Sequence, residues 1–289
     1  MSIFSKLFDF IRSIFCRKPI TDSTYIIPNS SKVALWFAVN DYPGTQNDLR
    51  GCVNDANGWT QLLSSQYGYS TRTCLNENAT RSNVLNNIKD LVNQAKSGKI
   101  THIVIGYSGH GSSVIDTDGD EDDGRDETLY VYDGNITDDE LRNVFSELPP
   151  TTKLTCVFDS CHSGTVTREM LNAVRDVYTN IKYMPPKDEM ETNALASLPL
   201  KRQIMYSEEG MSHVLIAGCL PVEYSYDANF GGIPNGSFSY YAIQTLRKTP
   251  MISYDEFYRL LRQQLPSPQY GQTPQLEGPM GRKQEIIFS

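Results

Sequence analysis

The chain has 289 residues, of which 39% are hydrophobic and 21% charged, a composition that can form a folded core without disulfides or structural metals. Its 26 Lys and Arg residues against 34 Asp and Glu residues give a formal charge of -8, which argues against nucleic acid as a partner. No run of about 18 apolar residues occurs, so the sequence predicts no membrane-spanning helix. The six cysteines form no CxxC pair, and we expect reduced thiols in a reducing, cytoplasmic environment.

The first 31 residues differ in pattern from the rest of the chain. Apolar residues between positions 3 and 16 recur at helical spacing, with Lys and Arg residues between or after them, which predicts an amphipathic helix. Two roles are open for this helix: docking on the domain or on a partner protein, and lying on a membrane surface with Cys16 as a lipidation site. Charges interrupt the apolar run and exclude a secretory signal. Residues 19–31 have the composition of a linker.

From residue 32 onward, segments typical of buried strands alternate with segments typical of helices. Short apolar runs predict strands at 33–39, 102–107, 154–158 and 213–218, with weaker candidates at 70–75 and 284–288. Helical periodicity covers 52–66, 80–97, 137–147, 237–248 and 253–264. This alternation predicts an α/β fold with a mostly parallel sheet flanked by helices, in which ligands bind at the carboxyl ends of the strands.

The stretch 165–212 interrupts this alternation. It contains Pro185, Pro186, Pro199 and many charged residues, and it has no clear strand pattern. A connection of this length within a folded chain is usually functional or disordered. We expect it to be an exposed connection between a larger first part and a smaller second part.

Two of the predicted strands end in residues with catalytic chemistry. His110 lies between two glycines in the run 105–113 (IGYSGHGSS), and Cys161 lies in the run 157–164 (VFDSCHSG). A thiolate is a strong nucleophile, and a nearby imidazole can take its proton and later protonate a leaving amine. The backbone N–H groups of Gly111 and Cys161 are placed to form an oxyanion hole.

A cysteine or a strand-end histidine is commonplace as a purely structural residue when either occurs alone. Their joint occurrence beside glycines, at the ends of two successive strands, favours a Cys161–His110 pair. His162 is the rival base. Adjacent side chains point apart along an extended backbone, so its imidazole is poorly placed to bond the thiol of Cys161.

These two motifs resemble those of a known family. YSGHG (107–111) and DSCHSG (159–164) resemble the catalytic motifs of the caspase-like cysteine peptidases, and specifically of the metacaspases. Further similarity lies at 40–56, 116–127, 136–141 and 270–276, so the resemblance spans about residues 33–288. The arrangement is similar to that of type I metacaspases, without their Pro-rich or zinc-finger prodomain.

The resemblance implies a caspase-like three-layer sandwich, in which a mostly parallel six-stranded sheet is flanked by helices. It implies a peptidase domain at 32–289 after the N-terminal segment 1–31. The domain divides into a large part (32–164), a connecting region (165–212) and a small part (213–289). The resemblance also implies a monomer acting on protein or peptide substrates. We expect a cytoplasmic protein, with membrane association through residues 3–16 as an open alternative.

The resemblance further assigns His110 as the general base and Cys161 as the nucleophile of a cysteine endopeptidase. Other positions match the family's first specificity pocket: Asp55 and Asp159 as its acids, and Cys52 and Ser108 beside them. Two carboxylates in a concave site select an ammonium or a guanidinium, so we expect cleavage after Arg or Lys. Taken alone, Asp55 would be interpreted as a carboxylate at the start of an exposed helix.

Acidic residues concentrate between Asp116 and Glu127, where the net charge is -7. A solvated loop is the ordinary interpretation of such a run. An EF-hand is excluded, because Glu121 stands where the calcium loop needs glycine. The resemblance implies a different calcium site and activation by calcium. Its matching ligands are Asp126, Asp138 and Asp139, with Glu169 as the substitute beside Arg168, which stands where the family has a fourth carboxylate.

Basic residues in the connecting region are candidate self-cleavage points for a peptidase of this specificity. Lys187, Lys201 and Arg202 lie in its most polar, proline-bounded stretches and are preferred. Two alternative functions stay open. One is a calcium-independent caspase-like peptidase with a merely solvated acidic loop. The other is a non-catalytic adaptor of caspase-like fold recruited through its N-terminal helix, against which the intact Cys161–His110 pair argues.

Overall fold

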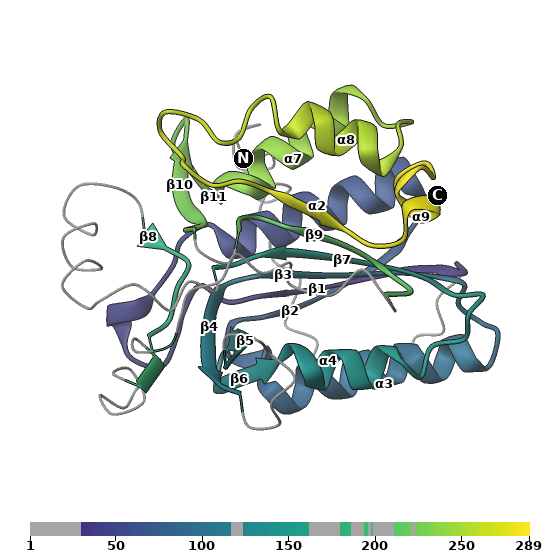
Figure 1. Cartoon of the computed structure of the whole chain (residues 1–289), viewed down its shortest axis with the longest axis horizontal. Helices are drawn as coiled ribbons and strands as arrows, with labels where there is room; N and C mark the ends of the chain where they lie inside the picture. Colours follow the sequence, from purple (N-terminus) through teal and green to yellow (C-terminus); the bar gives the residue numbers. More distant parts are fainter. Residues whose placement is uncertain are drawn as a thin grey trace, which may run out of the picture.

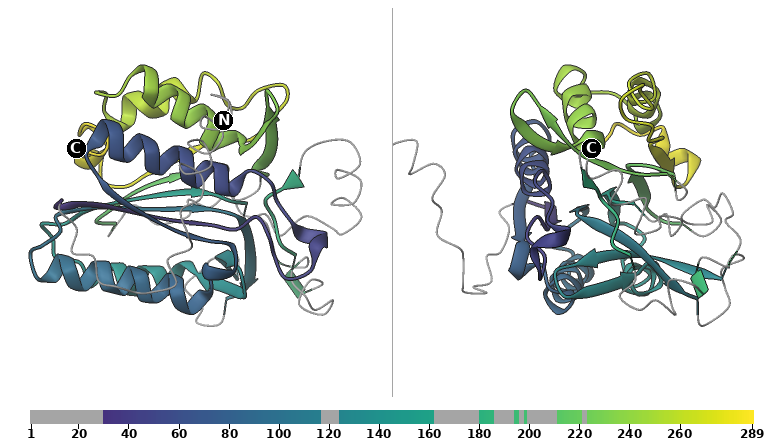
Figure 2. Two further views of the ribbon diagram at one scale, coloured as in Figure 1. Left: turned by 180° about the vertical axis from the view of Figure 1, so that it is seen from behind. Right: turned by 90° about the vertical axis from the view of Figure 1, so that its left-hand side faces the viewer.

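The computed structural model describes residues 30–116, 124–161, 180–185, 194–195, 198, 211–220 and 223–289. Within these ranges a six-stranded sheet lies between two layers of helices (Figure 1). One face carries α2 (Cys52–Tyr67), α7 (Ser237–Lys248) and α8 (Tyr254–Leu261), with the short α9 (Met280–Lys283) beside them. The other face carries α3 (Arg81–Lys96) and α4 (Asp138–Phe145), and Figure 2 shows the same separation from behind. The predicted helix-flanked α/β fold is confirmed.

The strands of the central sheet follow the order β12-β9-β7-β3-β1-β2. Their bounds are β1 Lys32–Ala38, β2 Ser70–Leu75, β3 His102–Ser108, β7 Lys153–Asp159, β9 Val214–Ala217 and β12 Gln275–Glu277. All neighbouring pairs are parallel except β12 with β9. The prediction that 284–288 closes the sheet was wrong. That segment packs its apolar residues into the core and bonds the chain ahead of α8, where Ile287 N–H donates to Ile252 O over 2.9 Å.

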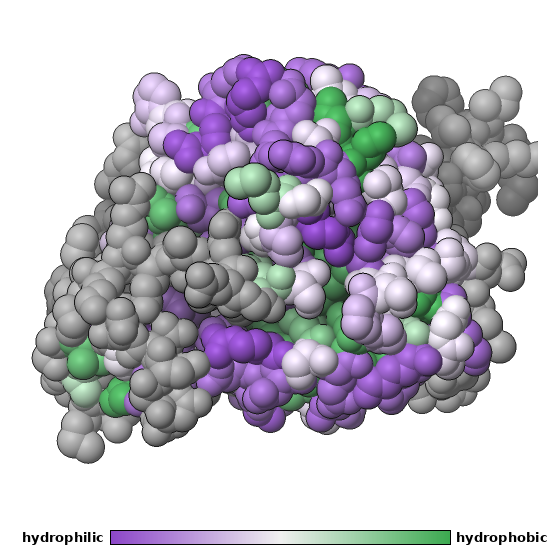
Figure 3. Space-filling view, turned by 45° about the vertical axis from the view of Figure 1, so that its right-hand side comes forward, coloured by the Kyte–Doolittle hydropathy of each residue, from purple (hydrophilic) through white to green (hydrophobic). Residues whose placement is uncertain are grey.

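Both faces of the central sheet are buried, which explains its nearly continuous apolar strands. Alternate residues of β1 point to opposite sides: Trp36 joins the cluster under α2, α7 and α8, whereas Leu35 and Phe37 join the cluster under α3. Trp36 stacks on Trp59 of α2 with ring centroids 5.1 Å apart. The outer face in Figure 3 is mainly hydrophilic, with only small apolar areas. The two clusters therefore hold most of the apolar surface and fix the sheet between the helices.

Two small sheets extend from the end of the central sheet at which β3 and β7 finish (Figure 1). One contains β4 (His110–Ile115), β5 (Arg125–Val131) and β6 (Gly134–Thr137), in that order. The other has the order β11-β10-β8, with β11 at Ile233–Gly236, β10 at Tyr226–Phe230 and β8 at Asn180–Ile181. Strand β8 lies inside the connecting region, where the sequence predicted no strand. It forms because β10 supplies a pairing edge that is distant in the sequence.

Local signals at the helix starts were mostly interpreted correctly. The Thr80 hydroxyl caps α3 by accepting from Asn83 N–H over 3.2 Å, as predicted. Helix α4 is capped by Thr137, one residue before the predicted Asp138, in a capping box with Glu140. None of the helices in the described ranges is long and apolar enough to cross a membrane. The N-terminal helix predicted within residues 3–16 lies outside the described residues.

His213, just ahead of β9, predicts a pH dependence of stability. Its ring packs on Phe145 with centroids 5.5 Å apart, and burial lowers the pKa of His213 to about 4. An unfolded chain protonates this histidine near pH 6.5. The unfolded state therefore binds more protons between about pH 6.5 and 4, and stability is lost as the pH falls through that window.

We predict that the free energy of unfolding falls by about 2 kcal/mol more between pH 7 and pH 5 in the parent protein than in His213→Gln. Urea unfolding at the two pH values measures this difference. Both proteins carry Cys161→Ala to keep the chain intact. An equal fall in both proteins would contradict the assignment to His213.

Candidate active site

The strand ends that carry His110 and Cys161 are neighbours in the central sheet. Strands β3 and β7 are parallel, and Ser108 stands opposite Asp159 at their carboxyl ends. Gly109 then turns the chain from β3 into β4, which begins at His110. A side chain at Gly109 would overlap the hydroxyl of Tyr107, so the turn requires glycine. The sheet register alone therefore delivers both motifs to one rim, as expected from parallel strands.

The imidazole of His110 is held on two sides. Its ring lies 4.7 Å from the Tyr42 ring, and its backbone N–H donates to the Tyr42 hydroxyl over 2.8 Å. Its Nε2 lies 2.7 Å from the carbonyl oxygen of Asn47. A carbonyl can only accept, so Nε2 carries the hydrogen, and the neutral ring keeps Nδ1 as its basic nitrogen. This orientation leaves Nδ1 available to take a proton.

Cys161 is fully buried at the end of β7 and lies against the backbone of Ser225. The Ser225 N–H donates to Cys161 Sγ over 2.6 Å, and the thiol lies 3.3 Å from the Ser225 carbonyl oxygen. The five described cysteines, Cys52, Cys74, Cys156, Cys161 and Cys219, are all free thiols. Cys161 thus remains a thiol rather than half of a disulfide.

The backbone N–H groups of Gly111 and Cys161 converge on a single oxygen. That oxygen is the carbonyl of Lys182, which lies 2.9 Å from Gly111 N and 3.1 Å from Cys161 N. Two N–H donors on one carbonyl oxygen, directly beside a thiol, form the arrangement that stabilises an oxyanion in acyl transfer.

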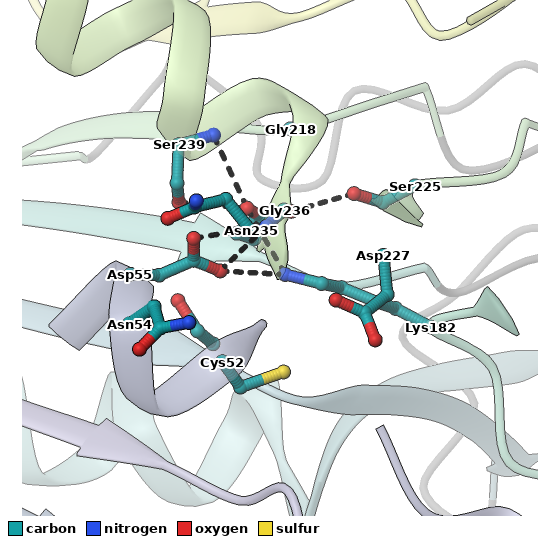
Figure 4. A network of polar contacts seen from close by, with 12 residues as sticks. Cys52, Asn54, Asp55, Lys182, Gly218, Ser225, Asp227, Asn235, Gly236 and Ser239 are labelled. Atoms are coloured by element: carbon teal, nitrogen blue, oxygen red, sulfur yellow. Dashed lines mark hydrogen bonds and ion pairs between the residues drawn. The ribbon is translucent and has the colours of Figure 1, made fainter. Parts of the chain in front are cut away.

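The side chain of Lys182 enters a closed acidic pocket (Figure 4). Its Nζ lies 3.1 Å from Asp55 Oδ2 and 3.1 Å from Asp159 Oδ2, and all three side chains are 0% exposed. Asp55 comes from α2 and Asp159 from the end of β7. The structure therefore brings together two carboxylates that are distant in the sequence and pairs both with one ammonium.

The small part of the chain supplies further contacts to these carboxylates. Gly236 N–H donates to Asp55 Oδ1 over 2.9 Å, and the Ser239 hydroxyl donates to Asp159 Oδ2 over 2.7 Å. The Ser225 hydroxyl donates to Asp159 Oδ1 over 2.6 Å. These bonds orient buried charges that would otherwise be costly to desolvate.

The pocket wall at Gly236 has no room for a side chain. A Cβ at this position would overlap the Asp159 carboxylate and the Lys182 ammonium. Cys52 lies beside the pocket at the start of α2, and burial keeps the pKa of its thiol well above the ordinary value. Ser108 is buried behind the pocket, where its hydroxyl accepts from the indole N–H of Trp36 over 3.4 Å. Of these two expected pocket residues, Cys52 borders the pocket and Ser108 contacts the core.

Burial and charge act in opposite directions on the ionised groups of the pocket. Burial raises the pKa of Asp55, while the Lys182 ammonium favours its carboxylate form. Burial alone would lower the pKa of Lys182, but the charges of Asp159 and Asp55 outweigh this effect and raise it well above the ordinary value. The pocket thus stabilises a bound cation. Without a cation, the same burial favours protonation of a carboxyl.

The residues expected to bind calcium lie together on a different part of the fold. Thr128 of β5 stands opposite Thr137 of β6, a register that brings Asp126 toward the start of α4, where Asp138 and Asp139 lie. Arg142 bonds both α4 acids, at 2.9 Å to Asp138 and 2.5 Å to Asp139. Among the described residues no group of three or more His, Cys, Asp or Glu side chains is arranged to hold a metal. Glu169, like the rival base His162, lies outside them.

Several residues of the site escaped the sequence analysis because their roles come from contacts over long sequence separations. Tyr42 and Asn47 support His110 from a loop, and Ser225 binds both Cys161 and Asp159. Lys182 was one of several basic residues in the connecting region. Its neighbours Ile181, Tyr183 and Met184 are buried, and this apolar flanking was the available signal. The preferred self-cleavage points Lys187, Lys201 and Arg202 lie outside the described residues.

Comparison with known proteins identifies the family. A family model described as the metacaspase, peptidase C14 domain matches residues 32–169. Metacaspase-1 of Schizosaccharomyces pombe is 32% identical over 87% of this chain and 68% of its own length. Metacaspase-1 of Meyerozyma guilliermondii is also 32% identical, over 93% of this chain and 75% of its own length.

Solved structures show the same fold at lower identity. A crystal structure of a protein from Geobacter sulfurreducens superposes with a TM-score of 0.66 at 23% identity, covering 89% of this chain and 98% of that one. Caspase-1 from Spodoptera frugiperda superposes with a TM-score of 0.57 at 13% identity, covering 91% of this chain and 93% of that one. Together with the sequence relatives, they place the sheet and its helices in the caspase-like architecture. The chain belongs to the metacaspase family of caspase-like cysteine peptidases.

Proposed function

We propose that this metacaspase is an endopeptidase that cleaves peptide bonds after Lys or Arg, with Cys161 as nucleophile and His110 as general base. The observation that supports it most directly is the sealed pocket in which Asp55 and Asp159 each lie 3.1 Å from one ammonium. Two buried carboxylates strongly favour a cation, and a guanidinium can bond both through its several N–H groups. They would repel a substrate Asp at the same position.

The proposed chemistry follows from the groups around Cys161. His110 Nδ1 takes the thiol proton, and the thiolate attacks the carbonyl carbon of the residue whose side chain fills the pocket. The N–H groups of Gly111 and Cys161 stabilise the resulting oxyanion. Collapse breaks the C–N bond, and the imidazolium protonates the leaving amine. A water molecule then hydrolyses the thioester and regenerates the thiol.

Calcium activation belongs to this proposal. The oxygen donors of Asp126, Asp138 and Asp139 suit a hard cation, and the fold gathers them at the start of α4. Arg142 already neutralises two of them, so calcium would have to displace its guanidinium.

A link from this acidic site to the connecting region supports regulation there. Arg125 precedes Asp126 in β5, and its guanidinium donates to the carbonyl oxygens of Leu195 and Leu198. A change of charge at Asp126 would therefore act beside the anchor of that region. Self-cleavage within 165–212 is the further part of the proposal, because an enzyme of this specificity meets basic residues in its own chain.

We predict turnover of fluorogenic peptides ending in Arg or Lys and none of peptides ending in Asp. Asp159→Asn should lower kcat/KM for the basic peptides by about a hundredfold or more, because it leaves the buried cation with one carboxylate. Cys161→Ala is the control for contaminating peptidases. Turnover of the Asp peptide, or undiminished turnover by Asp159→Asn, would contradict the pocket assignment.

Gly236 offers a second test of the pocket. We predict that Gly236→Ala destabilises the protein by about 1–3 kcal/mol through overlap with the pocket, and abolishes turnover of basic peptides. Gly134→Ala is the matched control, because a Cβ there meets open space. Thermal unfolding and peptide turnover of both variants measure the effects. Equal behaviour of the two variants would contradict the tight wall at Gly236.

Calcium dependence is tested by peptide turnover in calcium and in excess chelator, together with calorimetric titration of calcium. We predict loss of turnover in chelator and recovery with calcium. Arg142→Gln should bind calcium more tightly, because it removes the competing guanidinium, and Asp139→Asn more weakly. Full activity in chelator would support the calcium-independent alternative instead.

A further inference from the structure

A segment of the connecting region lies in the active site in extended conformation. Ile181 pairs with Tyr226 of β10 in antiparallel register. Tyr183 forms a parallel bridge with Gly111, and Met184 N–H donates to Gly111 O over 2.8 Å. The side chains of Ile181, Tyr183 and Met184 are all buried. The stretch 180–184 is therefore bound between two β edges, the manner in which peptides add to an exposed strand.

Within this segment Lys182 fills three binding positions at once. Its Nζ pairs with Asp55 and Asp159, and its carbonyl oxygen accepts from Gly111 and Cys161 N–H. Its own N–H donates to Ser225 O over 3.0 Å. The same Ser225 carbonyl lies 3.3 Å from Cys161 Sγ, so one peptide group contacts both the thiol and the amide of Lys182.

A purely structural ion pair explains only part of this arrangement. Pairing Lys182 with two buried carboxylates accounts for its side chain, but it does not require the carbonyl of the same residue to lie on the two N–H groups beside the thiol. The side chain and the carbonyl together match the groups of a residue whose following bond is to be cut. In the described part of the connecting region, Lys182 is the one Lys or Arg residue.

We propose that 180–184 is the enzyme's own bound substrate: Cys161 cleaves the Lys182–Tyr183 bond, and until that cut Lys182 excludes other substrates from the pocket. This inference rests on the proposed specificity for Lys and Arg. It assigns the cut to a bond other than those after Lys187, Lys201 and Arg202.

The reaction follows the chemistry of the site. The Cys161 thiolate attacks the Lys182 carbonyl carbon, whose oxygen gains negative charge against the Gly111 and Cys161 N–H groups. The C–N bond to Tyr183 breaks, and His110 gives the thiol proton to the Tyr183 nitrogen. Water then hydrolyses the thioester, which leaves Lys182 with a free carboxylate and restores the thiol.

Tethering explains why the uncut segment competes with other substrates. A segment joined to the site at both ends has an effective concentration in the millimolar range, far above that of an ordinary peptide substrate. Cleavage at Lys182 separates these ends, so each half is held by one connection only. The cut therefore removes most of the competition and opens the acidic pocket to substrates supplied from outside.

The test follows the full-length protein with time after addition of calcium, with chain termini identified by mass spectrometry and turnover of an Arg peptide recorded in parallel. We expect a new N-terminus at Tyr183, formed at a rate that does not change when the protein is diluted. Peptide turnover should begin with a lag that ends as this terminus appears. Cys161→Ala should stay intact.

Variants of Lys182 separate the cut from the exclusion. Lys182→Arg should be cut at the same bond, because a guanidinium also fits two carboxylates. Lys182→Met should remain uncut there and turn over the Arg peptide without a lag, at least about tenfold faster than the intact parent does initially. Lys187→Met is the matched control and should behave as the parent. Thermal unfolding checks that each variant is folded, and the parent's own termini test the site without any variant.

The outcomes distinguish this inference from the function on which it rests. Turnover of Arg and Lys peptides with the Lys182–Tyr183 bond intact would overturn the inference alone, as would a first cut after Lys187, Lys201 or Arg202. A lag that persists in Lys182→Met would overturn the exclusion. Absence of any turnover of basic peptides by parent and variants would overturn the proposed specificity, and the inference with it.

Discussion

The fully buried ion triad of Asp55, Asp159 and Lys182 is the interaction on which the rest of the site depends. Two carboxylates taken out of water are expensive, and their cost is offset only by a cation and by well-placed donors. The fold supplies those donors from β11 and α7, through Gly236 and Ser239, while α2 and β7 supply the carboxylates. The large and the small part of the chain are thus joined at one charged point, which is also the point that would recognise a substrate.

The catalytic groups occupy the same rim for a reason of geometry. Parallel strands end together, so the register of β3 against β7 sets the relative positions of His110 and Cys161 before any side chain is considered. Tyr42 and Asn47 then hold the imidazole, and Ser225 contacts the thiol. The chemistry of acyl transfer needs this rigidity, because small displacements of the reacting groups cost large factors in rate.

Much of the fold follows from local patterns in the sequence. The continuous apolar runs of β1, β3, β7 and β9 required burial on both faces, and helical periodicity located α2, α3, α4, α7 and α8 to within a few residues. The errors occurred where pairing partners are distant. Segment 284–288 resembles a strand but packs into the core, and β8 forms only because β10 offers an edge. A short window of sequence contains no information about such an edge.

By itself, the sequence determined the two catalytic motifs, their position at strand ends and the membership of Asp55 and Asp159 in one pocket through the family resemblance. The motifs are local, and their glycines reflect turns that any chain with this register must make. Only the tertiary structure decided that Lys182 occupies that pocket and that its carbonyl lies on the Gly111 and Cys161 N–H groups. Burial energy explains the difference: several basic residues of 165–212 are equivalent in the sequence, but the apolar neighbours of Lys182 pack beside the site and leave its ammonium between the only carboxylates within its reach among the described residues that pair with it.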